Sequence, residues 1–201
     1  MKKNLLSLAL AAALGTASLP ALAETWTVDN SHSTVGFAVR HMMVSNVKGT
    51  FDKFTASIDG SPADPGSAKI SATIEVASVN TREPKRDDHL RAADFFDAAK
   101  FPLMTFTSTK VEKVSATKAK VTGDLTLRGV TKPVTLDVEY TPVVKSPWGK
   151  SVVGATATGK INRQDFGVSF SKTLEAGGLL VGDEVTIQLE LELVKSDAPA
   201  K

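Results

Sequence analysis

Histidines are the side chains of this chain best suited to metal binding or acid–base chemistry, and its 201 residues contain three of them, His32, His41 and His89. None stands in an HExxH or HxH arrangement, so a metal site would have to be assembled from distant segments, and the sequence predicts none. The chain has no cysteine, which excludes disulfides, thiolate metal ligands and cysteine catalysis. His32 falls where an expected strand is interrupted, and we interpret it as a hydrogen-bonded structural residue.

A run of charged residues around His89 offers a second kind of chemistry, the binding of an anionic group. The run contains Arg82, Lys85, Arg86, Asp87, Asp88 and Arg91. Guanidinium and imidazolium groups at the rim of an opening can hold an anionic head group through charge-assisted hydrogen bonds. Asp87 and Asp88 compensate much of the positive charge, so a solvated helix face is the alternative interpretation.

Motifs for nucleophilic catalysis are weak in this chain. The sequence has no GxSxG and no serine whose context suggests activation, although the members of a Ser-His-Asp triad need not be adjacent. No glycine-rich loop leads from an expected strand into a helix, which argues against a nucleotide cofactor. A net charge of +2 is too small to indicate a polyanionic partner. We therefore expect a protein that is not an enzyme and that has no cofactor and no nucleic-acid partner.

The N-terminal segment has the three-part pattern of a secretory signal peptide. It consists of a positive start at Lys2 and Lys3, an apolar run over 5–14 and a small-x-small cleavage site over 21–23. The apolar run is much shorter than the roughly 20 residues that span a bilayer. We expect cleavage after Ala23 and one exported domain from 24 to 201, formally neutral and without an integral membrane segment.

Period-2 alternation of apolar and polar residues, typical of strands with one buried face, dominates the rest of the chain. The clearest segment is Val181–Lys195, in which Val185, Ile187, Leu189, Leu191 and Leu193 share one face. Lys118–Arg128 and Lys132–Thr141 repeat the pattern, and Val47–Asp59, Lys69–Val79, Leu103–Val114 and Ser151–Asn162 are further candidates. Near the start, Asn30-Ser31-His32 is expected to kink one long strand.

One stretch, Pro84–Lys100, breaks the alternation and predicts a short helix, with Pro84 at its first position. About eight antiparallel strands with one helical insertion fit an all-β barrel or a sandwich. The absence of disulfides and the short connections favour the barrel, since closure removes sheet edges. A barrel of this size is either filled by side chains or just wide enough for one small ligand. Small residues within strands, such as Gly36, Ala72 and Gly123, are compatible with an open lumen.

Four sequence blocks are distinctive when they are taken together. They are Trp26-x-Val28-Asp29-x-x-His32-Ser33 with Val35-x-Phe37-x-Val39-Arg40-His41 after it, Arg86-Asp87-Asp88-His89-Leu90-Arg91 followed by Asp94-Phe95-Phe96-Asp97 and Lys100-Phe101-Pro102, Gly123-Asp124-Leu125-Thr126-Leu127-Arg128-Gly129-Val130-Thr131-Lys132, and Asn162-Arg163-x-Asp165-Phe166-Gly167. In their residues and in their order, these blocks resemble the YceI-like family. The resemblance implies a lipocalin-like, eight-stranded antiparallel barrel in the periplasm. It also implies an elongated apolar cavity that binds a polyisoprenoid, such as a prenyl phosphate or a quinone tail.

The resemblance and the strand patterns predict a carrier for an isoprenoid lipid, acting in isoprenoid metabolism, transport or a stress response. The candidate cavity walls are Phe37, Val39, Phe51, Ile74, Leu90, Phe95, Phe106, Leu125, Leu127, Leu136, Val138, Phe166, Phe170, Ile187 and Leu189. The candidate head-group ligands are Arg40, His41, His89 and Arg91. Two other functions stay open, a stress-protective protein with a filled barrel and an enzyme acting on a lipid inside it. A homodimer also stays open.

Overall fold

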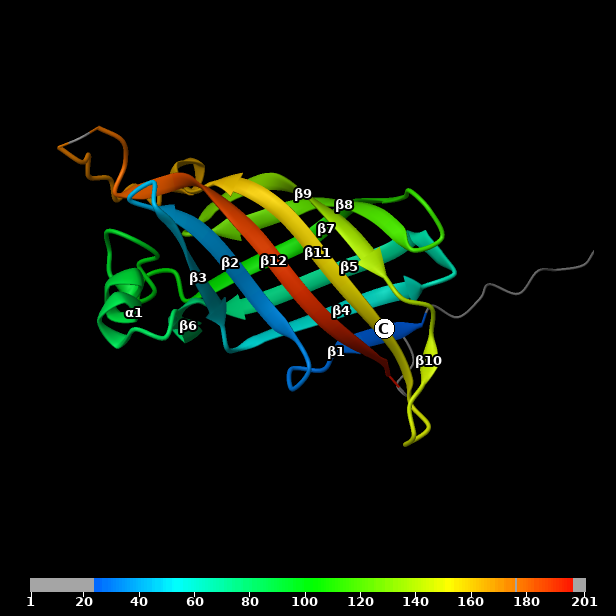
Figure 1. The fold of residues 1–201 in the computed structure, drawn as a ribbon. Helices are drawn as coiled ribbons and strands as arrows, with labels where there is room; N and C mark the ends of the chain where they lie inside the picture. Colours follow the sequence, from blue (N-terminus) through cyan, green and yellow to red (C-terminus); the bar gives the residue numbers. More distant parts are fainter. Residues whose placement is uncertain (1–23, 176, 197–201) are drawn as a thin grey trace, which may run out of the picture.

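A closed antiparallel barrel of eight long strands, with one short α-helix at one end, makes up the domain (Figure 1). The computed structural model describes residues 24–175 and 177–196, and the expected signal peptide, residues 1–23, lies outside the described residues. The all-β barrel with a helical insertion that the sequence predicts is confirmed.

The elements follow one another as an up-and-down meander. They are β1 (Thr25–Val28), β2 (Thr34–His41), β3 (Ser45–Phe51), β4 (Phe54–Ser61), β5 (Asp64–Glu75), η1 (Val76–Ser78), β6 (Val79–Asn80), α1 (Pro84–Arg91), β7 (Leu103–Lys113), β8 (Lys118–Leu127), β9 (Val130–Tyr140), β10 (Val144–Lys145), β11 (Ser151–Asn162), η2 (Arg163–Phe166) and β12 (Val181–Lys195). β11 pairs with β12 from Val152↔Val194 to Asn162↔Glu184, and this ladder closes the cylinder. Closure pairs most strands on both sides, whereas β3 pairs fully with β2 and on its other side only at Thr50 and Phe51, with β6.

β1 and β2 form one long kinked strand, as the sequence predicts. Both pair with the same edge of β12, Val28 opposite Leu193 and Thr34 opposite Glu190. Between them, the backbone N–H and the hydroxyl of Ser31 donate to Asp29 Oδ1 at 2.8 and 2.6 Å, and His32 Nδ1 lies 3.2 Å from Asp29 Oδ2. These hydrogen bonds, those from Ser31 first, lower the pKa of Asp29 below its usual value. His32 is therefore part of the hydrogen-bonded kink.

The strands with the clearest alternation have the predicted faces. In β8, Ala119, Val121, Leu125 and Leu127 are buried, and in β9 Val134 and Leu136 are buried on the same side of the sheet. β11 spans Ser151–Asn162, the range expected from the sequence. Alternation works here because each strand has a wet outer face and a dry inner face.

The helix is shorter than predicted: α1 ends at Arg91 rather than near Lys100. Glu83 caps its N-terminus by accepting from the Lys85 N–H, and Pro84 occupies the first helical position. Ala92 leaves the helix with ψ 169°, and the residues that follow form turns. These turns place Phe95 and Phe96 against the barrel core. No helix in the described part of the chain is long and apolar enough to cross a bilayer.

Candidate functional site

An elongated cavity of about 580 Å³ runs inside the barrel. Every strand of seven residues or more contributes inward-facing side chains to it, and nearly all of these side chains are apolar. Many wall residues are half-buried rather than fully buried, among them Phe37, Phe106 and Leu189, because they face the cavity. The barrel is therefore not filled by its own side chains, although barrels of this size can be.

The structure brings nearly all of the predicted wall residues to this cavity. Those that line it are Phe37, Val39, Phe51, Ile74, Leu90, Phe95, Phe106, Leu125, Leu127, Leu136, Val138, Phe170, Ile187 and Leu189. Phe166 is not among the lining residues; it lies in η2, only 2% exposed, and packs in the core cluster that contains Phe95 and Val168. Sequence reasoning missed other wall residues, including Phe54, Phe96 and Met104.

Small residues in the strands serve two different purposes. Gly36, Ala72 and Ala155 line the cavity and leave space in it. Gly123 does not, because a Cβ there would lie 2.4 Å from Phe106 Cζ and 2.5 Å from the Thr107 carbonyl oxygen. The absent side chain of Gly123 is thus replaced by the ring of Phe106 from the neighbouring strand β7.

One end of the cavity is closed by apolar packing. Trp26, Val153 and Leu193 form a cluster with exposures of 2, 4 and 5%, and Ile58 and Ala155 pack against it. Leu193, Ile58 and Ala155 also line the cavity, so this cluster is its floor. The floor lies at the β1 end of the barrel, opposite α1 (Figure 1).

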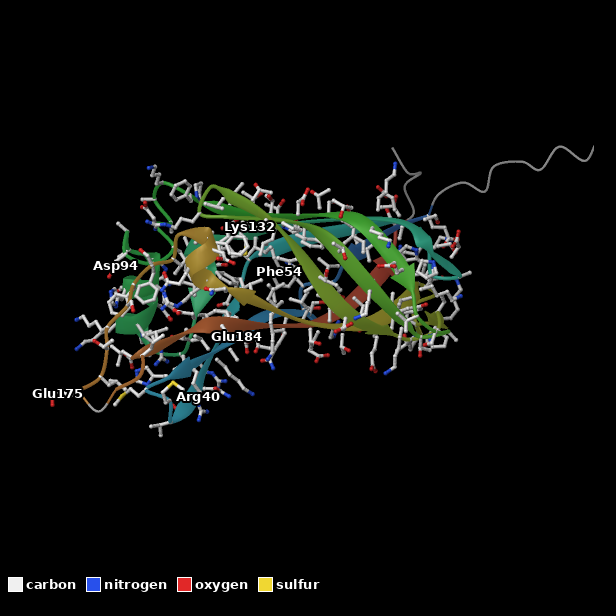
Figure 2. All side chains as sticks on the ribbon, turned by 90° about the horizontal axis from the view of Figure 1, so that it is seen from above. Arg40, Phe54, Asp94, Lys132, Glu175 and Glu184 are labelled. Carbon is white, nitrogen blue, oxygen red and sulfur yellow. The ribbon has the colours of Figure 1, made fainter. Side chains whose placement is uncertain are left out.

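The other end, beside α1, is open. Three residues that line the cavity there, Arg86, His89 and Lys172, are also exposed to solvent. Apart from Thr55, the side chains with hydrogen-bonding or charged groups that line the cavity gather at this end: His41, Thr81, Arg86, His89, Arg163 and Lys172. Figure 2 shows Arg40, Asp94 and Glu175 at the same end, whereas Phe54 lies within the barrel. The site is therefore an apolar tube with a polar mouth.

Arg86 is held at the mouth by a buried chain of hydrogen bonds. Its Nε donates to Thr81 Oγ1 at 2.7 Å and its Nη2 to the Thr81 carbonyl at 3.0 Å. The Thr81 hydroxyl and backbone N–H both donate to Asp87 Oδ1, at 2.6 and 2.8 Å, and Asp87 is 7% exposed. The carboxylate that partly compensates the positive run thus also fixes the position of a cation at the cavity.

His89 and two phenylalanines form an aromatic group on the rim. The imidazole meets the rings of Phe95 and Phe170 edge-on, with centroids 4.8 and 5.3 Å away, and these two rings stack at 4.7 Å. His89 Nε2 lies 2.6 Å from Asp94 Oδ2, which orients the imidazole. This side of the mouth is therefore apolar with a polar outer edge.

Arg163 is buried, and its guanidinium is bonded to the protein rather than available to a ligand. With 4% exposure it donates to the carbonyls of Val168 (2.6 Å), Gly182 (2.9 Å) and Val181 (3.2 Å) and to Asp183 Oδ1 (2.9 Å). Burial lowers the pKa of Arg163 below its usual value and Asp183 opposes the shift, but an arginine remains protonated at neutral pH. The Arg163 hydrogen bonds connect η2 to the start of β12.

The four predicted head-group ligands divide into two pairs. His41 and His89 line the cavity, whereas Arg40 and Arg91 do not. Arg40 donates to the Met43 carbonyl at 2.9 Å on the outside of β2, and Arg91 donates to the carbonyls of Ala77 (2.8 Å) and Val79 (3.1 Å). Arg86 takes the place expected of Arg91. Helical spacing could have identified it, because Arg86, His89 and Leu90 stand at i, i+3 and i+4 on one face.

One group of potential metal ligands exists among the described residues. Its members are Asp29, His32 and Glu192, whose ligand atoms lie within 4.8 Å of one another on the outside of the barrel kink. Asp29 already accepts hydrogen bonds from Ser31 and His32 there, so the group has a structural role without an ion.

Comparison with known proteins agrees with the fold. The family model described as YceI-like domain matches residues 26–193. A Staphylococcus aureus (strain N315) protein named UPF0312 protein SA2479 is 40% identical over 173 residues, which cover 86% of this chain and 98% of that protein. The crystal structure of the Campylobacter jejuni YCEI protein is 40% identical with a TM-score of 0.69, over 79% of this chain and 90% of that one.

A more distant structure shares only the fold. It is a polyisoprenoid binding domain from Saccharophagus degradans, 16% identical with a TM-score of 0.61, over 85% of this chain and 98% of that one. The family match over nearly all of the barrel and the close relative lead to the same assignment as the four sequence blocks. The chain belongs to the YceI-like family.

Proposed function

We propose that this chain is an exported carrier that holds one isoprenoid lipid in its barrel. The observation that carries the proposal is the cavity itself: about 580 Å³, apolar along its length, closed at the Trp26 floor and open at a polar mouth. A long, flexible and insoluble hydrocarbon needs a continuous dry space of this kind. A protective protein with a filled barrel would have no such space.

The proposed ligand lies with its tail toward the floor and its head group at the mouth. Burial of apolar surface contributes about 25 cal/mol per Å², so several isoprene units supply a large favourable term before the cost of ordering the chain. Arg86, Lys172, His41 and His89 are the groups at the mouth that can contact a phosphate or a quinone head group. Arg86 is preorganised by Thr81, which reduces the cost of binding an anion.

Two further observations support this proposal. The fold is shared with the polyisoprenoid binding domain from Saccharophagus degradans. Residues 1–23 have the sequence pattern of a signal peptide, which supports export and a periplasmic location. A binding role fits better than catalysis, because Arg86 and Arg163 at the mouth are held by hydrogen bonds to the protein and the tube wall is apolar.

A matched pair of variants on β12 tests the proposal. Leu189 lines the cavity and Glu190, the next residue, lies on the opposite face of the strand. Delipidated mature protein is titrated with a polyprenyl phosphate and with an isoprenoid quinone, and folding is verified by circular dichroism. Leu189→Glu places a charge in the apolar tube and is expected to abolish binding, whereas Glu190→Leu retains it. Equal binding by folded Leu189→Glu and Glu190→Leu would contradict the cavity as the site.

A further inference from the structure

The turn between β2 and β3 exposes three consecutive apolar side chains. Met42, Met43 and Val44 are 43, 58 and 76% exposed. The turn is well formed, because the Val44 N–H donates to the His41 carbonyl at 3.0 Å and the Met43 carbonyl accepts from Arg40 at 2.9 Å. These three residues, which we call the apolar tip, are thus held in solvent by a defined backbone.

The backbone of the apolar tip is one that methionine disfavours. Met42 and Met43 have φ of 51 and 60°, the combination of a type I′ turn, for which Asn-Gly is the preferred pair. The turn between β8 and β9 has the same signs of φ at Arg128 and Gly129 and uses a glycine at its second position. Backbone strain that carries exposed apolar side chains points to a function for those side chains.

The apolar tip lies at the mouth of the cavity. His41, which begins the turn, lines the cavity, and so does Leu180, whose carbonyl accepts from the Met42 N–H at 2.9 Å. The backbone carbonyl of Lys172, at the same mouth, accepts from the Leu180 N–H at 2.8 Å. Leu180 therefore links the loop that carries Lys172 to the apolar tip. A surface that contacts the apolar tip would therefore also contact the mouth of the cavity.

We propose that the apolar tip inserts into the surface of a lipid bilayer and seats the mouth of the cavity on it. This inference rests on the proposed function, because an insoluble isoprenoid must come from and return to a bilayer. Methionine and valine side chains at the tip bury in the acyl boundary, and the exposed cations Arg40 and Lys172 lie where lipid phosphates would meet them. The lipid then passes between bilayer and barrel without crossing water.

The opposite end of the barrel provides a built-in control. Val143, Val144 and Trp148 are 48, 58 and 86% exposed around β10, which lies at the end away from α1 (Figure 1). Val44 and Val144 are therefore the same residue type, both exposed, at opposite ends of the barrel. If vesicle binding depended only on general surface hydrophobicity, the loss of a valine at either end would weaken it. Docking through the mouth depends on the apolar tip alone.

Vesicle flotation tests the inference with phosphatidylethanolamine–phosphatidylglycerol vesicles that contain no isoprenoid. The mature wild-type protein and Val144→Asp are expected to float with the vesicles. Val44→Asp and the double change Met42→Asn with Met43→Gly are expected to bind about tenfold more weakly, since each removes apolar side chains that would be buried. The double change gives the turn its preferred residues, so its thermal midpoint is expected to equal or exceed that of wild type.

Ligand binding in the absence of vesicles separates this inference from the proposed function. With an isoprenoid supplied from detergent, the tip variants are expected to bind as wild type does. A wild type that does not float, equal losses for Val44→Asp and Val144→Asp, or loss of detergent-supplied ligand by the tip variants would each overturn the docking role. Failure of the wild type to bind any isoprenoid while it still floats overturns the proposed function and leaves the docking result in place.

Discussion

The two ends of the barrel are stabilised by different interactions. The closed end is held by packing of Trp26, Val153 and Leu193, none of them more than 5% exposed. The open end is held by arginines that donate to backbone carbonyls, Arg163 to three of them and Arg91 to two. Packing fills space and hydrogen bonds at the rim do not. Apolar packing continues toward the open end, where Phe95, Phe166 and Val168 are buried, and the arginine hydrogen bonds fix the rim of the opening without filling it.

The largest expected effect is at the floor. Trp26→Ala should lower the free energy of unfolding by about 3–5 kcal/mol, because it removes a fully buried aromatic side chain. The indole Nε1 has no hydrogen-bond partner among the described residues, so Trp26→Phe loses buried volume but no hydrogen bond and should cost less than Trp26→Ala. Urea unfolding measures both. Trp148→Ala is the matched control, expected within about 0.5 kcal/mol of wild type because Trp148 is 86% exposed.

A similar but smaller effect is expected at the mouth. Arg163→Met should destabilise by about 3 kcal/mol, because it leaves buried carbonyls without donors and Asp183 without its cation. Arg163→Lys keeps the charge but cannot reproduce the planar set of bonds, so it should recover only part of the loss. Urea unfolding again gives the values. If Arg163→Met were as stable as wild type, packing rather than hydrogen bonds would hold the open end.

The barrel strands were predictable because each has one wet and one dry face. The alternation in Val181–Lys195 placed Ile187 and Leu189 on the inner face, and both line the cavity. The end of α1 was not predictable from periodicity, because Ala92 leaves the helix to bring Phe95 into the core. That turn depends on contacts with the rest of the barrel, which local sequence does not contain.

The mouth was predicted less well than the walls for a related reason. Arg40 donates to the Met43 carbonyl, and Arg91 donates to the carbonyls of Ala77 and Val79. These hydrogen bonds do not follow from the sequence spacing. The Phe106 ring occupies the space beside Gly123, and this contact likewise depends on the register between β7 and β8. A small residue in a strand can leave space or accept a neighbour, and only the register decides which.

The smallest expected effect is at the kink between the two ends. The folded-state pKa of Asp29 lies below its unfolded value. Ionised Asp29 therefore stabilises the folded state above the ordinary pKa of about 3.9, and this stabilisation is lost as the pH falls through the folded-state pKa. Asp29→Asn removes this contribution at every pH. The thermal midpoint of wild type should therefore exceed that of the variant slightly at pH 6, and the gap should narrow toward pH 3. A gap that widens on acidification would contradict the role of the Ser31 and His32 hydrogen bonds.

The central claim, that the tube holds an isoprenoid chain, is tested most directly on protein purified without detergent from its own cells. Native mass spectrometry should show a mass above that of the polypeptide alone, and organic extraction should release an isoprenoid lipid. A mass equal to that of the polypeptide alone, together with no uptake of added prenyl lipids, would contradict the account.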